Sequence, residues 1–230
     1  MQINDTLAAL TVFNLLFSAA HAANIPVPTP RPQISAPVPN PPFPKPADPN
    51  HAIASACHLQ LAAIHAVFKP VPPVSDPKGC AIIDPVELSA IPGGAALTPP
   101  ALLECETALK LVTFLRDTAQ RTAVTTLGST LKTFVQDSAY VCRSRNGTSK
   151  LSEHAFGRAI DIGAFVTATG ETIAVKAADT KDKKHDAFLA AIRTAACGPF
   201  TTVLGPGSDA DHALHFHFDR APRKGKPFCQ

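Results

Sequence analysis

The sequence predicts an α+β domain in which a small antiparallel sheet is flanked by helices and cross-linked by disulfides. Segments with helical patterns come early in the chain, short strand-like segments come late, and six cysteines are dispersed among them. Helices and strands that are segregated along the chain are typical of α+β architecture. Hydrophobic residues make up 45% of the chain, which is enough for a packed core.

The first 22 residues are predicted to be a signal peptide. An apolar stretch over residues 7–20 has the length of a signal-peptide core and is too short for a comfortable membrane span. Ala20 and Ala22 provide small residues at the positions that a signal peptidase inspects, so we expect cleavage after Ala22. Because no Lys or Arg precedes Leu7, an uncleaved anchor stays an alternative. No later run approaches membrane length, so we expect no stable membrane span after cleavage.

A proline-rich linker is predicted over residues 23–50. Eleven of the 25 residues from Pro26 to Asn50 are proline, which fixes φ and has no backbone N–H. We therefore expect an extended spacer, serving either as a tether or as a passive linker. All six cysteines lie in residues 51–230, which we interpret as one domain.

The cysteines predict three disulfides. Their number is even and no two have the CxxC spacing of zinc knuckles or redox motifs. Dispersed cysteines in an exported protein are most simply explained by disulfides, although the sequence does not choose among the pairings. The candidates are Cys57, Cys80, Cys105, Cys142, Cys197 and Cys229.

The first half of the domain is predicted to contain two helices. A helix is expected over residues 54–67, followed by an irregular segment over 68–97 that is rich in Pro and Gly. Thr98 is the expected N-cap of a second helix, with Pro99 and Pro100 in its first turn. Apolar residues at helical spacing then continue to about Thr118.

The second half is predicted to supply the sheet. A hairpin that turns at Thr169-Gly170 and a helix over residues 184–196 are the most distinctive elements. The expected strands cover residues 131–135, 139–143, 158–166, 172–175, 201–204 and 213–219.

The last expected strand carries the sequence HFHFD. Because alternate side chains of a strand share a face, His215, His217 and Asp219 are expected on one side and two phenylalanines on the other. The phenylalanine face suits a core. The histidine face suits either a metal site or the solvent-facing side of an edge strand.

A second polar cluster lies upstream, where Gly157 separates His154 from Asp161. Asp161 stands in an apolar run, and a buried carboxylate needs a partner, which is either a metal ion or the nearby Arg158. Together with the downstream histidines, the chain offers two imidazoles and a carboxylate. Three protein ligands with a fourth position left to water are typical of catalytic zinc sites.

Both clusters resemble motifs of known families. SEHAFGRAID and HFH resemble the SxHxxGxAxD and HxH motifs of zinc D-Ala-D-Ala carboxypeptidases and penicillin-insensitive murein endopeptidases, whose metal core hedgehog domains share. The stretch from about Cys57 to Cys229 is still more similar to the C-terminal domain of bacterial extensin-like proteins, with which it shares YVCRSRN, LSEHAFGRAIDIGAF, TTVLGPGSD and HFHFD. The resemblance implies a zinc D-Ala-D-Ala peptidase/hedgehog-like fold.

The peptidase resemblance also implies a metal site. It implies that Zn²⁺ is bound by His154, Asp161 and His217. His215 would be the catalytic acid/base, which matters because Leu214 stands where some carboxypeptidases have a glutamate.

Substrate binding is implied for two further residues. Ser152 would help to orient the substrate, and Arg143 would bind a substrate carboxylate, with Arg145 as the alternative. Asp219 would either orient a metal ligand or form an ordinary salt bridge.

We therefore expect an exported zinc metallopeptidase of the periplasm or cell wall that hydrolyses peptides of bacterial peptidoglycan. One alternative is a non-catalytic, zinc-stabilised wall-binding domain, and another is a metal-free disulfide scaffold. The net charge of +3 is too small and too evenly spread to indicate nucleic-acid binding. The bond that is cut, carboxy- or endopeptidase action, and the oligomeric state are left open.

Overall fold

The computed structural model describes residues 55–178 and 181–230. The predicted signal peptide and proline-rich linker lie outside the described residues. Among the residues that are described, no helix is both long and apolar enough to cross a membrane.

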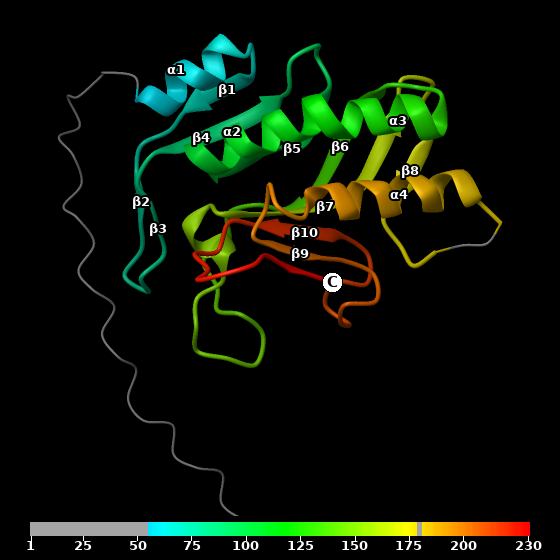
Figure 1. The fold of residues 1–230 in the computed structure, drawn as a ribbon. Helices are drawn as coiled ribbons and strands as arrows, with labels where there is room; N and C mark the ends of the chain where they lie inside the picture. The colour runs from blue at the N-terminus through cyan, green and yellow to red at the C-terminus, as the bar shows by residue number, and fades with distance from the viewer. Residues whose placement is uncertain (1–54, 179–180) are drawn as a thin grey trace, which may run out of the picture. The chain divides into compact units, whose positions relative to one another are not determined.

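A mixed sheet of nine strands forms the centre of the domain (Figure 1). Its order is β1-β4-β5-β6-β7-β10-β9-β11, with β8 paired to β7. The bounds are β1 Val67–Pro70, β4 Pro85–Ala90, β5 Ala96–Glu104, β6 Leu131–Ser138, β7 Ala159–Thr167, β8 Thr172–Ala174, β9 Thr202–Leu204, β10 Phe216–Asp219 and β11 Phe228–Cys229. A separate small hairpin joins β2 (Val74–Ser75) to β3 (Ala81–Ile82).

The α+β class is confirmed, but the expectation of a small, purely antiparallel sheet is wrong. β5 pairs with β6 in parallel, and β11 pairs with β9 in parallel. The sheet is larger than expected because the segment over 68–97, predicted to be irregular, contributes β1, β4 and the start of β5. The two prolines of this segment that lie in strands stand at strand ends, Pro70 in β1 and Pro85 in β4, where a missing N–H is tolerated.

Four α-helices accompany the sheet in the described ranges: α1 Ala56–Ala63, α2 Cys105–Phe114, α3 Gln120–Leu127 and α4 Lys183–Ala196. A π-helical turn, Leu115–Ala119, joins α2 to α3. Figure 1 shows α2, α3 and α4 over one side of the sheet, with α3 and α4 in contact. The helix predicted over residues 184–196 is confirmed, whereas the first helix ends earlier than predicted, at Ala63.

The helix predicted to begin at Thr98 begins instead at Cys105. Thr98, Pro99 and Pro100 lie within β5. The ladder between β5 and β6 ends at Thr98, and the ladder between β4 and β5 passes over both prolines. Because neither proline needs to donate a ladder hydrogen bond, the strand accommodates a sequence that is typical of a helix start.

Two other strand predictions differ in outcome. The hairpin is confirmed, since β7 and β8 pair around a turn in which Gly170 has a φ of 94°. The strand predicted over residues 139–143 is wrong. β6 ends at Ser138, and residues 139–143 form a loop outside the sheet. Cys142 in this loop is bonded to Cys80 near β3.

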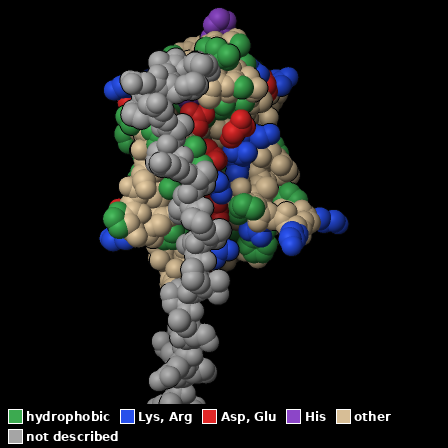
Figure 2. Space-filling model, turned by 90° about the vertical axis from the view of Figure 1, so that its left-hand side faces the viewer, with side chains coloured by type: hydrophobic (Ala, Val, Ile, Leu, Met, Phe, Trp, Pro, Cys, Tyr) green, Lys and Arg blue, Asp and Glu red, His purple; other side chains and the backbone are tan. Residues whose placement is uncertain are grey.

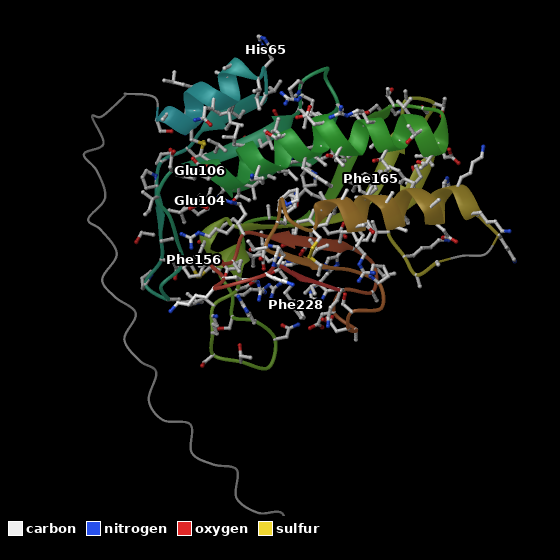
Figure 3. All side chains as sticks on the ribbon, viewed as in Figure 1. His65, Glu104, Glu106, Phe156, Phe165 and Phe228 are labelled. Carbon is white, nitrogen blue, oxygen red and sulfur yellow. A yellow bond between two sulfur atoms is a disulfide. The ribbon has the colours of Figure 1, made fainter. Side chains whose placement is uncertain are left out.

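The core lies between the sheet and the helices. Phe165 of β7, labelled in Figure 3 beside α3 and α4, packs edge to face against Phe188 of α4, with ring centroids 5.1 Å apart. Phe218 of β10 packs in the same way against Phe114 of α2. Since alternate residues of β10 point to opposite faces, His217 faces away from the helices.

All six cysteines form disulfides, as the sequence predicts. The pairs, which the sequence did not determine, are Cys57–Cys105, Cys80–Cys142 and Cys197–Cys229. They connect α1 to α2, β3 to the loop after β6, and the end of α4 to β11. Cross-links of this kind stabilise a fold by restricting its unfolded chain.

Candidate metal centre

Two adjacent strands of the sheet, β7 and β10, position two of the predicted site residues, Asp161 and His217. β7 and β10 pair in antiparallel register, and Asp161 lies directly opposite His217. Both residues are buried, and both side chains extend from the face that the helices leave uncovered. The predicted alternation in HFHFD is thus confirmed for His217 and Asp219, although β10 begins only at Phe216.

A short 3₁₀ helix, Glu153–Phe156, positions His154 next to Asp161 and His217. Ser152 caps this turn, with its Oγ accepting the backbone N–H of His154. Gly157 ends it at a φ of 63°, and a Cβ on this glycine would lie 2.6 Å from the backbone nitrogen of Glu104. Figure 3 shows Glu104 and Phe156 on the same side of the domain, where the turn meets the start of α2.

Three predicted ligands converge in the structure. Nε2 of His154 lies 3.2 Å from Nδ1 of His217 and 3.2 Å from Oδ2 of Asp161. Nδ1 of His217 lies 2.8 Å from Oδ1 of Asp161. One ligand atom from each residue lies within 4.8 Å of the others, and all three residues are buried.

Each of the two histidines forms a hydrogen bond directed away from the cluster, and this bond determines which ring nitrogen presents a lone pair to the cluster. Nδ1 of His154 lies 2.5 Å from the carbonyl oxygen of Ala139, and a carbonyl only accepts, so Nδ1 carries the hydrogen. Nε2 of His217 likewise donates to Asp219, with its Oδ2 at 3.1 Å. In neutral histidines the inward atoms are therefore two lone pairs and a carboxylate, with no hydrogen among them. Such a set of acceptors fits a cation, and two nitrogens with one carboxylate oxygen suit zinc.

The electrostatics of the cluster agree with this requirement. Burial alone would raise the pKa of Asp161, but the imidazoles of His154 and His217 hold it well below its usual range. Burial would lower the pKa of His217, but hydrogen bonds to Asp161 and Asp219 outweigh it and raise the pKa to about 9. The ionised form of Asp161 is thus favoured, and this is the form that can bind a cation.

His215 lies beside the three predicted ligand residues. Its Nε2 is 3.6 Å from Oδ1 of Asp161, and its side chain is half-buried at the pocket. Burial lowers its pKa, and the neighbouring His212 and His217 lower it further against the opposing effect of Asp161. The residue predicted as acid/base therefore lies next to the cluster but is not one of the three residues that converge.

The cluster opens onto a pocket of about 390 Å³. Arg143 and Ser152, both predicted to act on substrate, line it together with Arg145, the alternative to Arg143. Arg145 forms an ion pair with the buried Glu153 at 3.0 Å. Among the described residues, the guanidinium of Arg143 contacts only the carbonyl of Ser144, at 3.4 Å, so it is the more available of the two guanidinium groups.

The pocket contains residues that the sequence analysis did not select. The ring of His212 lies 5.5 Å from that of His217. Arg223 and Phe228 also line the pocket, and Phe228 lies on the side of the sheet away from the helices (Figure 3). These two residues belong to no recognisable motif. They lie in the segment that follows β10, and the path of that segment brings them to the pocket. The nearness of His212 to HFHFD was a signal that could have been used.

One other group in the described chain has metal-like spacing, namely Cys57, Asp84 and Cys105. Its two sulfurs are bonded to each other, so neither is available as a thiolate ligand.

The fold and the cluster define a disulfide-bonded α+β domain with a buried His–Asp–His site open to a pocket. Residues 55–230 match the family model described as "Extensin-like protein C-terminus". The chain belongs to this family, as its motifs predict. No curated protein and no solved structure gives a significant match to the chain.

Proposed function

We propose that the protein is an exported zinc metallopeptidase that hydrolyses peptide bonds of bacterial peptidoglycan. The observation that carries this proposal is the convergence of two imidazole nitrogens and one carboxylate, from His154, His217 and Asp161, beside an open pocket. Catalytic zinc sites use three protein ligands of these types, whereas structural sites use four. The resemblance of the surrounding motifs to murein peptidases directs the proposal to peptidoglycan.

Export is supported by the covalent structure. All six cysteines are bonded to one another, and disulfides persist in oxidising compartments outside the cytoplasm. A protein in the periplasm or cell wall would meet peptidoglycan there. The predicted signal peptide over residues 1–22 belongs to the same proposal.

In this mechanism the chain's own residues hold the ion, move a proton and bind the substrate. A zinc ion, when bound, supplies Lewis acidity and lowers the pKa of a water molecule. His215 would accept a proton from the attacking water and return it to the departing amine, because its Nε2 lies 3.6 Å from Asp161 at the edge of the cluster and its side chain lines the pocket. Leu214 is exposed and has no group that could share this task.

Substrate orientation is assigned to Arg143 and Ser152. The guanidinium of Arg143 has no ion pair with any described residue and would bind a substrate carboxylate through two parallel hydrogen bonds. Ser152 already accepts the backbone N–H of His154, so we assign it first to holding His154 in place. Its hydroxyl hydrogen is free of that contact and could be donated toward substrate.

The proposal is tested by digesting purified bacterial sacculi with the full-length protein. We expect soluble fragments with new amino termini to appear with zinc and to disappear with a chelator. The variant His215→Ala should bind zinc but release at least about a hundredfold less product, in line with the loss of a general base. The matched control is His65→Asn, which changes an exposed histidine on the far side of the domain (Figure 3).

The outcomes separate the alternatives. Zinc binding without fragments would favour the non-catalytic wall-binding domain. Absence of zinc would favour a metal-free disulfide scaffold. Fragments that persist in His215→Ala would contradict the role given to His215.

A further inference from the structure

A second pocket adjoins the one at the metal cluster. It has a volume of about 340 Å³ and shares three lining residues with the first pocket, Arg145, Glu153 and Arg223. These side chains therefore stand between the two pockets. A ligand longer than the first pocket can continue into the second by passing over them.

The second pocket is rich in positive charge. Four cationic side chains line it against one acidic side chain, Glu153. Arg145 is paired with Glu153, and Arg158 is paired with Glu104 at 3.4 Å. Basic and acidic side chains also adjoin one another along the face shown in Figure 2. Among the lining cations, Lys150 and Arg223 form no ion pair with a described residue.

Arg223 is fixed in position although it carries no ion pair. Its Nη2 and Nε both donate to Oγ1 of Thr202, at 2.7 Å and 3.3 Å. Its guanidinium also lies over the ring of Phe228, 5.4 Å from the centroid. Thr202 is buried in β9, so the arginine is held by the sheet itself.

These contacts leave a specific part of the guanidinium available. Thr202 occupies the edge formed by Nε and Nη2, and Phe228 covers one face. The remaining edge, formed by Nη1 and Nη2, keeps N–H groups spaced to donate to both oxygens of one carboxylate. An arginine that is held in place in this way loses little conformational entropy on binding.

We propose that Arg223 binds a substrate carboxylate at the junction of the two pockets, so that the substrate is an extended acidic peptide. One carboxylate is bound by Arg143 at the metal cluster, and a second, farther along the peptide, is bound by Arg223, with the chain continuing toward Lys150. This inference rests on the proposed function and specifies its substrate class. A short peptide with one carboxylate would not use Arg223.

The test measures binding separately from hydrolysis. The probe is the peptide-bearing fragment pool that a muramidase releases from sacculi, compared with the same pool after its carboxylates have been converted to amides. Both pools are titrated into full-length, zinc-supplied His215→Ala protein, in which turnover is suppressed. The comparison is repeated with three double variants, in which His215→Ala is combined with Arg223→Ala, Arg223→Lys or the control Lys224→Ala. The control removes one positive charge at a neighbouring residue that lines neither pocket.

We expect the native pool to bind at least about tenfold more tightly than the amidated pool. Arg223→Ala should lose about tenfold in affinity for the native pool and nothing for the amidated pool. Arg223→Lys should fall between, because an ammonium keeps the charge but not the planar pair of donors. Lys224→Ala should behave as the parent protein.

Three results would overturn the inference: equal binding of the two pools, no effect of Arg223→Ala, or no binding of the native pool. Each variant is checked by circular dichroism and thermal unfolding, and Arg223→Lys gives a second reading should the alanine variant unfold. The parent protein, with His215 intact, could also bind the native pool through Arg223 without hydrolysing it. That result would refute the proposed peptidase activity but would keep Arg223 as a residue that binds acidic peptides.

Discussion

Nε2 of His217 donates a hydrogen bond to Oδ2 of Asp219, 3.1 Å away and two residues later on the same strand. The other oxygen of Asp219 accepts the backbone N–H of Ala221 at 2.9 Å, so the carboxylate is held in place. This pair turns Nδ1 of His217 toward His154 and Asp161. A carboxylate that fixes the tautomer of a metal-binding histidine is a recurrent arrangement around zinc.

The first prediction concerns this orienting carboxylate. Asp219→Asn should weaken zinc binding by about ten- to hundredfold, because it removes the charge that fixes and polarises His217. The measurement is a competition titration with a coloured chelator. Asp211→Asn, which alters an exposed carboxylate in the same pocket, is the control and should leave the affinity unchanged. Equal affinities for parent and Asp219→Asn would reduce Asp219 to an ordinary salt bridge.

The second prediction separates the two arginines that the sequence left as alternatives. Arg143→Ala should raise KM for sacculus fragments about tenfold and change the free energy of unfolding by less than about 0.5 kcal/mol. Arg145→Ala should instead cost about 1–2 kcal/mol of stability, because it leaves the buried Glu153 unpaired while its own side chain is partly exposed. Stability is measured by urea unfolding and KM by steady-state kinetics for both variants. If Arg145→Ala raises KM and Arg143→Ala lowers stability, the substrate role belongs to Arg145.

A third prediction tests how the turn that carries His154 is held. Gly157→Ala should destabilise the protein by about 2–5 kcal/mol, since it adds strain at positive φ to a collision with the backbone of Glu104. Gly128→Ala also stands at positive φ but meets open space, so it should cost only about 1–2 kcal/mol. Urea unfolding gives both values. Similar losses for the two variants would mean that close packing at Gly157 contributes little.

The fourth prediction concerns the disulfide beside Arg143. Replacing Cys80 and Cys142 together by serine, or Cys57 and Cys105 together, should cost about 4 kcal/mol in each case, because the paired cysteines are 62 and 48 residues apart. Only the first replacement should also raise KM, since it frees the loop that presents Arg143. Kinetics at a temperature where both variants stay folded provide the check, and a KM that rises equally in both would contradict this positioning role.

Much of the site could be predicted because its geometry is encoded locally. The alternation of a strand places His217 and Asp219 together, and an acidic residue in the apolar run around Asp161 requires a partner. Arg223 and Phe228 could not be found in this way. They reach the pocket through the path of the chain after β10, and no periodic pattern describes such a path.

The fold was predictable where periodicity was long and failed where proline was ambiguous. The pattern of α4 and the Thr169-Gly170 turn gave correct elements. Thr98-Pro99-Pro100 has the composition of a helix start, yet it lies in β5 at a place where the ladders do not require its N–H groups. Local propensity alone contains no information about which N–H groups a sheet will use.

The most direct test of the metal centre is the zinc content of the purified full-length protein, measured by native mass spectrometry. We predict one zinc ion per chain, its loss when His154 and His217 are both changed to glutamine, and its retention in His65→Asn. A parent protein that takes up no zinc from a stoichiometric supply, or a double variant that retains the ion, would contradict the account.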